Sequence, residues 1–127
     1  VFGMFAAWSA YGLQDYMAWN TARWRAVDIL RVKYHAADTE IDGGFEFNGM
    51  YTSEEYIRRL REEPNFNPDT RSLWVINATY LISPERMLGR GWEPELLEAV
   101  PYYSWLAKTQ HLYILRLEQA PGGTAKY

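Results

Sequence analysis

The sequence predicts an α+β fold, in which a long N-terminal helix and a second short helix pack on a small, mainly antiparallel sheet of three to four strands. Three observations support this prediction. Residues 13–34 contain neither glycine nor proline, residues 52–63 form a shorter helical stretch, and apolar runs rich in strand-forming residues follow at 73–82 and 111–118. A chain of 127 residues is long enough for one domain with a modest core.

The helix expected over residues 13–34 has an amphipathic face, because apolar residues recur there at spacings of three and four. Asn20 and Arg23 interrupt this face with polar groups. Buried polar groups need hydrogen-bond partners, so we interpret the two residues as a structural pair. The predicted face consists of Leu13, Tyr16, Asn20, Arg23, Val27, Leu30 and Tyr34.

Residues 1–14 carry no charged side chain, and Trp8, Tyr11, Tyr16 and Trp19 lie within or just after this run. A membrane span needs about 20 apolar residues, so the run is too short to cross a bilayer alone. It can be a buried helix of a soluble domain, or the end of a transmembrane helix, where aromatic residues gather. We assign 1–12 to the end of a transmembrane or apolar helix, 13–120 to a single α+β domain and 121–127 to a flexible tail.

Residues 40–49, EIDGGFEFNG, alternate between apolar and polar positions, which predicts an extended strand packed on the first helix. Phe45 and Phe47 should then point inward, and Glu46 or Asn48 should bond a partner, most simply Arg23. The glycine pair Gly43-Gly44 marks a bulge or a close approach of backbone, so we expect a side chain at Gly44 to be excluded.

The second helix is expected to begin at Thr52, which forms a capping box with Glu55, and to end before Pro64. Its apolar residues should be buried and its charged residues should form a solvated face. The predicted buried residues are Tyr56, Ile57 and Leu60.

The sheet should be built around a central strand, Leu73–Ile82, whose nearly continuous apolar character predicts burial on both faces. Residues 96–105 are compatible with a strand carrying Pro101 at a bulge or edge, or with a short helix opened by Pro94. A last strand is expected over 111–118.

Composition narrows the possible functions. The net charge is −3 with no basic run, so we expect no nucleic-acid partner. The chain has no cysteine and only two histidines, so no metal site and no cofactor are predicted. Asp42 and Glu46 are the candidate acid and base, but on an extended strand they would stand roughly 13 Å apart. Glycoside hydrolysis needs carboxyl groups about 5–10 Å apart, so no catalytic residue is assigned.

Two motifs resemble a known family. The run D-Y-x-A-W-N-x-A-R-W (15–24) and the run I-D-G-G-F-E-F-N-G (41–49) are similar to the C-terminal extracytoplasmic region of bacterial polytopic membrane proteins related to dolichyl-phosphate-mannose-protein mannosyltransferases. The resemblance favours the transmembrane interpretation of the first residues. It implies a location on the extracytoplasmic face of the inner membrane and a partner in the transmembrane portion of the parent protein. The matched residues are Asp15, Asn20, Arg23, Trp24, Gly43, Gly44, Glu46, Asn48 and Gly49.

The catalytic acids of that family belong to loops between earlier transmembrane helices, which no part of this chain matches. The resemblance therefore implies a non-catalytic accessory domain of a lipid-linked sugar transferase, which shapes acceptor access or contacts glycan. The alternative is a small soluble carbohydrate-active enzyme that uses Asp42 and Glu46 as acid and base. A third reading of residues 40–49 is purely structural. The candidate binding residues are Asp42, Glu46, Asn48, Arg23, Trp74, Trp92 and Trp105.

Overall fold

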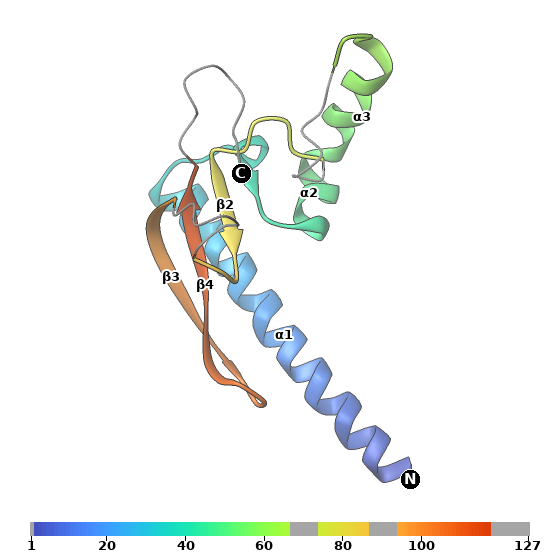
Figure 1. The fold of residues 1–127 in the computed structure, drawn as a ribbon, viewed down its shortest axis with the longest axis vertical. Coiled ribbons are helices and arrows are strands. Elements are labelled where there is room, and N and C mark those ends of the chain that lie inside the picture. The colour runs from blue at the N-terminus through green and yellow to red at the C-terminus, as the bar shows by residue number, and fades with distance from the viewer. Residues whose placement is uncertain (1, 67–73, 87–93, 118–127) are drawn as a thin grey trace.

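The computed structural model describes residues 2–66, 74–86 and 94–117. The chain is α+β, as predicted, with one long helix, two shorter helices and a four-stranded sheet (Figure 1). Leu73, Trp92 and the tail 121–127 lie outside the described residues. The elements are α1 (Phe2–Lys33), η1 (Asp38–Glu40), β1 (Ile41–Asp42), α2 (Phe45–Tyr51), α3 (Ser53–Glu62), β2 (Tyr80–Ser83), β3 (Glu95–Ser104) and β4 (Lys108–Arg116).

The sheet has the strand order β1-β2-β4-β3. Only the β1–β2 pair is parallel, and β2–β4 and β3–β4 are antiparallel, so the predicted mainly antiparallel sheet is confirmed. Of residues 96–105, all but Trp105 lie on β3, so this segment is a strand and not a helix. Pro101 lies on β3, at the edge of the sheet, where a missing backbone donor is tolerated.

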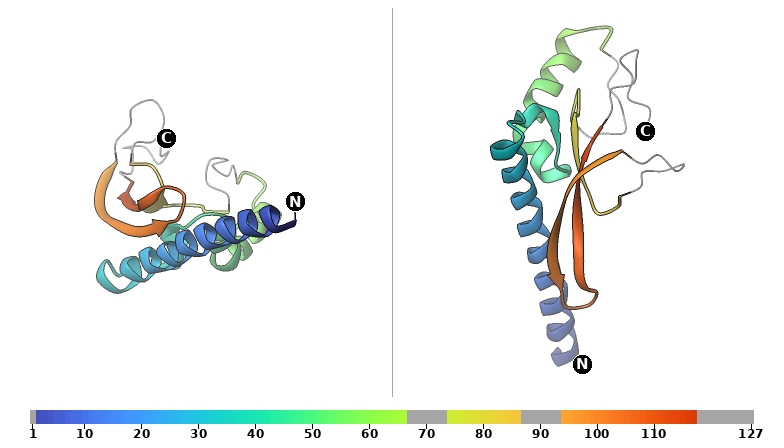
Figure 2. Two further views of the ribbon diagram at one scale, coloured as in Figure 1. Left: turned by 90° about the horizontal axis from the view of Figure 1, so that it is seen from below. Right: turned by 90° about the vertical axis from the view of Figure 1, so that its left-hand side faces the viewer.

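The core lies where α1 crosses the sheet (Figure 2). Small residues on the helix, Ala22 and Ala26, are buried beside Val27 and Leu30, and β3 and β4 contribute Val100, Leu112 and Ile114. The predicted helix face is therefore right from Arg23 to Leu30. It is wrong for Leu13 and Tyr16, which are exposed because the body of the sheet covers only the C-terminal half of α1.

The molecule is elongated, and its two ends differ in chemistry. The first turns of α1 and the turn of the β3–β4 hairpin lie at one end of the long axis, and α3 lies at the other (Figures 1 and 2). The side chains in the first turns are open to solvent, with Phe2 92% and Trp8 72% exposed. Among the described residues, no helix combines the length and the apolar character that a bilayer crossing requires.

The predicted strand at 40–49 is wrong. Only Ile41 and Asp42 are extended; the chain then turns at Gly43-Gly44 and continues as α2. The physical reason is Gly44, whose φ of 85° and ψ of 175° belong to a region essentially limited to glycine and redirect the backbone. On the helix, Phe47 points inward as predicted, but Phe45 is exposed.

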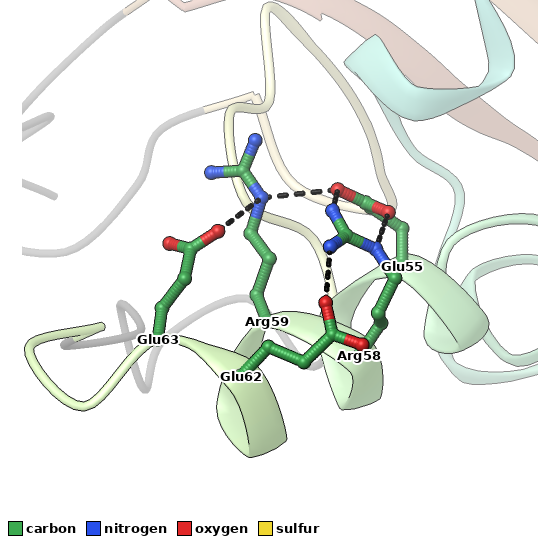
Figure 3. A network of polar contacts seen from close by, with 5 residues as sticks. All are labelled: Glu55, Arg58, Arg59, Glu62 and Glu63. Carbon is green, nitrogen blue, oxygen red and sulfur yellow. Dashed lines mark hydrogen bonds and ion pairs between the residues drawn. The ribbon is translucent and has the colours of Figure 1, made fainter.

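The helix expected at 52–63 is present as α3, but its predicted cap and buried side are wrong. The Thr52 hydroxyl donates to the Asn48 carbonyl at 2.8 Å and caps nothing. Ile57 and Leu60 are exposed because α3 stands away from the sheet, and Tyr56 is only partly buried. Its charged face is solvated as predicted, and hydrogen bonds from Arg58 and Arg59 lower the pKa of Glu55 to about 2 (Figure 3).

The predicted central strand is shorter than expected. β2 lies between β1 and β4, so its interior position is right, but it begins only at Tyr80. Trp74 has a positive φ of 63°, which is incompatible with an extended strand there. Tyr80 and Leu81 are only partly buried, so burial on both faces is wrong. β2 pairs with β4 over all four of its residues and with β1 over only two.

Candidate functional site

The candidate site is centred on Arg23, whose side chain is only 3% exposed. Its Nη2 donates to Asn20 Oδ1 at 2.6 Å and also to Glu46 Oε2. Asn20 lies three residues before Arg23 and therefore shares its helix face. The guanidinium carbon lies 4.8 Å from the ring centre of Trp19 and 5.8 Å from that of Trp24. These contacts confirm the predicted pairing of Arg23 with Asn20 and Glu46.

Glu46 lies in the first turn of α2, which the Gly43-Gly44 turn directs toward α1. Tyr16 Oη donates to Glu46 Oε1 at 2.5 Å, so two residues of α1 hold this carboxylate. The hydrogen bonds from Tyr16 and then Arg23 hold the pKa of Glu46 below its usual range, and the same bond raises the pKa of the Tyr16 phenol. The Glu46 side chain is still 45% exposed, so it remains accessible to a ligand.

Asp42 and Asn48 form a second group, which closes the turn between β1 and α2. Asn48 Nδ2 donates to Asp42 Oδ1 at 2.8 Å, and the Gly44 backbone N–H donates to the same oxygen at 3.2 Å. The Gly43 N–H donates to Asn48 Oδ1 at 3.1 Å. Asn48 is buried. Both side chains therefore satisfy the backbone of the turn that positions Glu46.

The predicted tryptophans do not join this site. Trp74 packs on Phe45, with ring centres 5.0 Å apart, and an added Cβ at Gly49 would lie 3.1 Å from Trp74 Cζ3. Trp105 lies at the β3–β4 turn and contacts α1 through Tyr11. Trp92 lies outside the described residues. Of the predicted binding residues, the structure brings together Arg23, Asp42, Glu46 and Asn48.

Sequence reasoning missed two members of the site, Tyr16 and Trp19. Tyr16 lies seven residues before Arg23 and so shares its helix face, which was a usable signal. Its contact with Glu46 could not be seen, because that contact depends on where α2 begins. The Tyr16 and Trp19 rings lie 6.2 Å apart and form an aromatic border beside the carboxylate.

The chemistry open to this arrangement is limited. Because a guanidinium and a phenol hold the pKa of Glu46 below its usual range, the side chain is ionised near neutral pH, has no proton to donate and is a weak base. Within the described ranges, no three His, Cys, Asp or Glu side chains are grouped so that they could hold a metal ion. The exposed side of the cluster can instead offer an acceptor oxygen and ring faces to a polar ligand.

Comparisons of the chain with known protein families, with curated proteins and with solved structures found no match. The family resemblance of residues 15–24 and 41–49 stays a hypothesis.

We expect Glu46→Gln to reduce the pH dependence of stability on the acid side. The pKa of Glu46 is lower in the folded chain than its unfolded value of about 4.3, so its contribution is present above that pH and is lost as pH falls through the folded pKa. The stability difference between the two proteins should shrink as pH falls from 6 toward 3. Urea denaturation at several pH values measures it.

Other carboxylates, such as Glu55 and Glu98, also have lowered pKa values. Their contributions are the same in both proteins and cancel when the two free energies of unfolding are subtracted at each pH. Tyr16→Phe removes one donor to Glu46 and should raise the folded pKa toward the unfolded value, with a smaller effect. A difference that stays constant with pH would show that these contacts do not perturb Glu46 in solution.

Proposed function

We propose that this chain is a non-catalytic, membrane-associated accessory domain, whose first turns of α1 lie in a bilayer while the sheet and the shorter helices stand outside it. Following the resemblance, we propose that it serves a lipid-linked sugar transferase on the extracytoplasmic face of a bacterial inner membrane. Its partner would be the transmembrane portion of the parent protein.

The observation that carries this proposal is the exposure of apolar side chains on every side of the start of α1. Residues 2–14 carry no charge, and the described residues 2–13 are all exposed. An apolar patch of this kind is unfavourable in water and marks a protein or membrane contact. A helix that is apolar all round suits lipid, since a single protein surface would cover only one side. The large exposed side chains are Phe2, Met4, Phe5, Trp8, Tyr11 and Leu13.

The polarity of the long axis supports the same proposal. The uncharged turns lie at one end, and the Glu–Arg network of α3 lies at the other (Figures 1 and 3). Trp8, Tyr11, Tyr16 and Trp19 occupy the region where α1 changes from uncharged to charged. Tryptophan and tyrosine are enriched at that level of a bilayer. The domain would thus stand upright, with α3 farthest from the membrane.

The non-catalytic role is supported by the engagement of the two candidate carboxylates. Glu46 accepts from Tyr16 and Arg23, and Asp42 accepts from Asn48 and from the turn backbone. A general acid needs a proton to donate and a general base needs a pKa near the working pH, and the lowered pKa of Glu46 opposes both roles. Turnover of aryl glycosides that disappears in Glu46→Gln would contradict this role and support the enzyme alternative.

Glycan contact is a second candidate function, favoured by the exposed side of the Arg23 site. Tyr16 is exposed, Trp19 is partly buried, and their rings border the half-exposed carboxylate of Glu46. Ring faces beside fixed acceptors are the groups that a sugar would use. Through this contact the accessory domain would bind the acceptor or the lipid-linked sugar directly.

We expect the 127-residue chain to bind vesicles of phosphatidylcholine and phosphatidylglycerol through α1. The double variant Phe5→Ser/Trp8→Ser should bind at least roughly 100-fold more weakly, because each lost apolar side chain removes about 1.5–3 kcal/mol of burial. Both side chains are exposed, so the fold should be unaffected. Flotation with vesicles measures the partition.

The matched control is Ile57→Ser/Leu60→Ser, which removes two exposed apolar residues from α3 at the other end of the molecule. This variant should bind vesicles like the unchanged chain. Equal losses in both double variants would show non-specific adhesion. No binding by the unchanged chain, together with concentration-dependent self-association, would contradict membrane insertion of α1.

A further inference from the structure

The β3–β4 hairpin ends in an exposed apolar turn. Trp105 is 51% and Leu106 62% exposed, and Tyr103 just before them is also exposed. The turn between β3 and β4 lies at the end of the molecule where the first turns of α1 project (Figures 1 and 2). Turn residues are usually small or polar. A tryptophan and a leucine at the tip of a hairpin are therefore unusual, and packing in the core does not explain them.

This turn is fixed to α1 by Asp15, the first charged residue of the chain. Asp15 Oδ2 accepts from Ser104 Oγ at 2.7 Å, and Asp15 Oδ1 accepts from the Trp105 backbone N–H at 2.7 Å. Tyr11 packs edge-on against Trp105, with ring centres 5.1 Å apart. The hairpin turn is therefore held at the level where α1 changes from uncharged to charged.

The turn also has a charge pattern that matches a lipid headgroup layer. Lys108 follows Leu106 by two residues, is exposed, and has a positive φ of 61°. An aromatic ring and an aliphatic side chain can enter the interfacial layer while an adjacent ammonium group meets lipid phosphate.

We propose that the β3–β4 turn is a second membrane-contacting element, in which Trp105 and Leu106 enter the bilayer interface and Lys108 contacts anionic headgroups. This inference rests on the proposed function, since it takes the bilayer that α1 enters as the occupant. The second contact would also define the orientation of the domain on the membrane. One helix in lipid leaves the domain free to rotate about that helix, whereas a second contact beside it fixes which face of the sheet is turned to the membrane.

Single-cysteine labelling tests this inference, because the chain has no cysteine of its own. An environment-sensitive NBD fluorophore is placed at Leu106→Cys on the turn, at Phe5→Cys on α1 and at Leu60→Cys on α3, all exposed positions. With phosphatidylcholine–phosphatidylglycerol vesicles, the labels at 106 and 5 should shift to the blue and be quenched by spin-labelled lipid. The label at 60 should not change.

The outcomes separate this inference from the proposed function. A response at 5 without one at 106 overturns the hairpin contact and leaves insertion of α1 standing. No response at either position overturns both. A shift at 106 that appears without lipid as protein concentration rises identifies a second copy of the chain as the occupant, and also overturns the proposal.

The contact of Lys108 with anionic headgroups is tested by two charge-reversal variants. Lys108→Glu should weaken binding to phosphatidylglycerol-containing vesicles roughly tenfold and leave binding to pure phosphatidylcholine nearly unchanged. Arg61→Glu makes the same charge change on α3 at the other end and should have little effect on either. Equal losses for the two variants on the anionic vesicles would show only general electrostatics and would overturn the Lys108 contact.

Discussion

Replacing Phe47 with alanine is expected to lower the free energy of unfolding by about 3–5 kcal/mol, the usual range for a fully buried phenylalanine. Phe47 is 0% exposed and packs on Trp24 and Tyr51, with ring centres 5.9 and 4.8 Å away. Small domains have only about 5–15 kcal/mol of stability, so this one substitution should remove a large part of it. Urea denaturation followed by tryptophan fluorescence measures the loss.

Phe45→Ala is the matched control, because it makes the same change two residues earlier on α2. Phe45 is 64% exposed and packs only on one side, against Trp74. Its replacement should cost less than about 1 kcal/mol. If residues 40–49 were an extended strand, the two phenylalanines would share one face and lose similar stability. Equal losses would therefore support the strand and contradict α2.

The first helix and the last strand could be predicted because the apolar pattern of each is long. The α1 face from Arg23 to Leu30 and the apolar run of β4 each extend over several repeats of their own period. Residues 40–49 are different, since a glycine pair divides them into pieces too short to separate period two from period 3.6. Phe45 and Phe47 are compatible with either, and only the positive φ of Gly44 selects the helix.

The Arg23–Glu46 pair could be predicted although the local structure was wrong. A buried guanidinium needs an acceptor, and Glu46 lies next to the inward-facing Phe47 in the sequence. The positions of Trp74 and Trp105 could not be predicted, because they depend on which segments meet in space. Asp15 and Tyr16 are consecutive, so their side chains leave α1 about 100° apart. Asp15 holds the β3–β4 hairpin, and Tyr16 binds Glu46 in the candidate site.

Replacing Gly43 with alanine is the other substitution from which we expect a large loss, about 3 kcal/mol. A Cβ added at Gly43 would lie 2.7, 2.8 and 2.9 Å from Cγ, Cδ1 and Cβ of Phe47. Phe47 is fully buried and cannot move aside without displacing Trp24 or Tyr51. The close approach predicted for the glycine pair is therefore real, but it falls at Gly43 and not at Gly44.

Gly44→Ala is the comparison that separates a clash from backbone strain. A Cβ there would have open space, with Arg23 Nη1 3.8 Å away, but the φ of 85° would cost about 1–3 kcal/mol in any other residue. The two mechanisms differ in their coupling to Phe47. In a Phe47→Ala background, stabilised with an osmolyte if needed, Gly43→Ala should cost at least about 1 kcal/mol less, since the ring atoms are gone.

Gly44→Ala should cost the same in both backgrounds, because its strain lies in the backbone and involves no Phe47 atom. The remaining cost of Gly43→Ala reflects the Cβ of residue 47, which alanine retains. If the cost of Gly43→Ala were independent of residue 47, the turn would not be packed against that ring. The same turn positions Glu46 against Arg23, so its packing determines both the stability of the domain and the geometry of the candidate site.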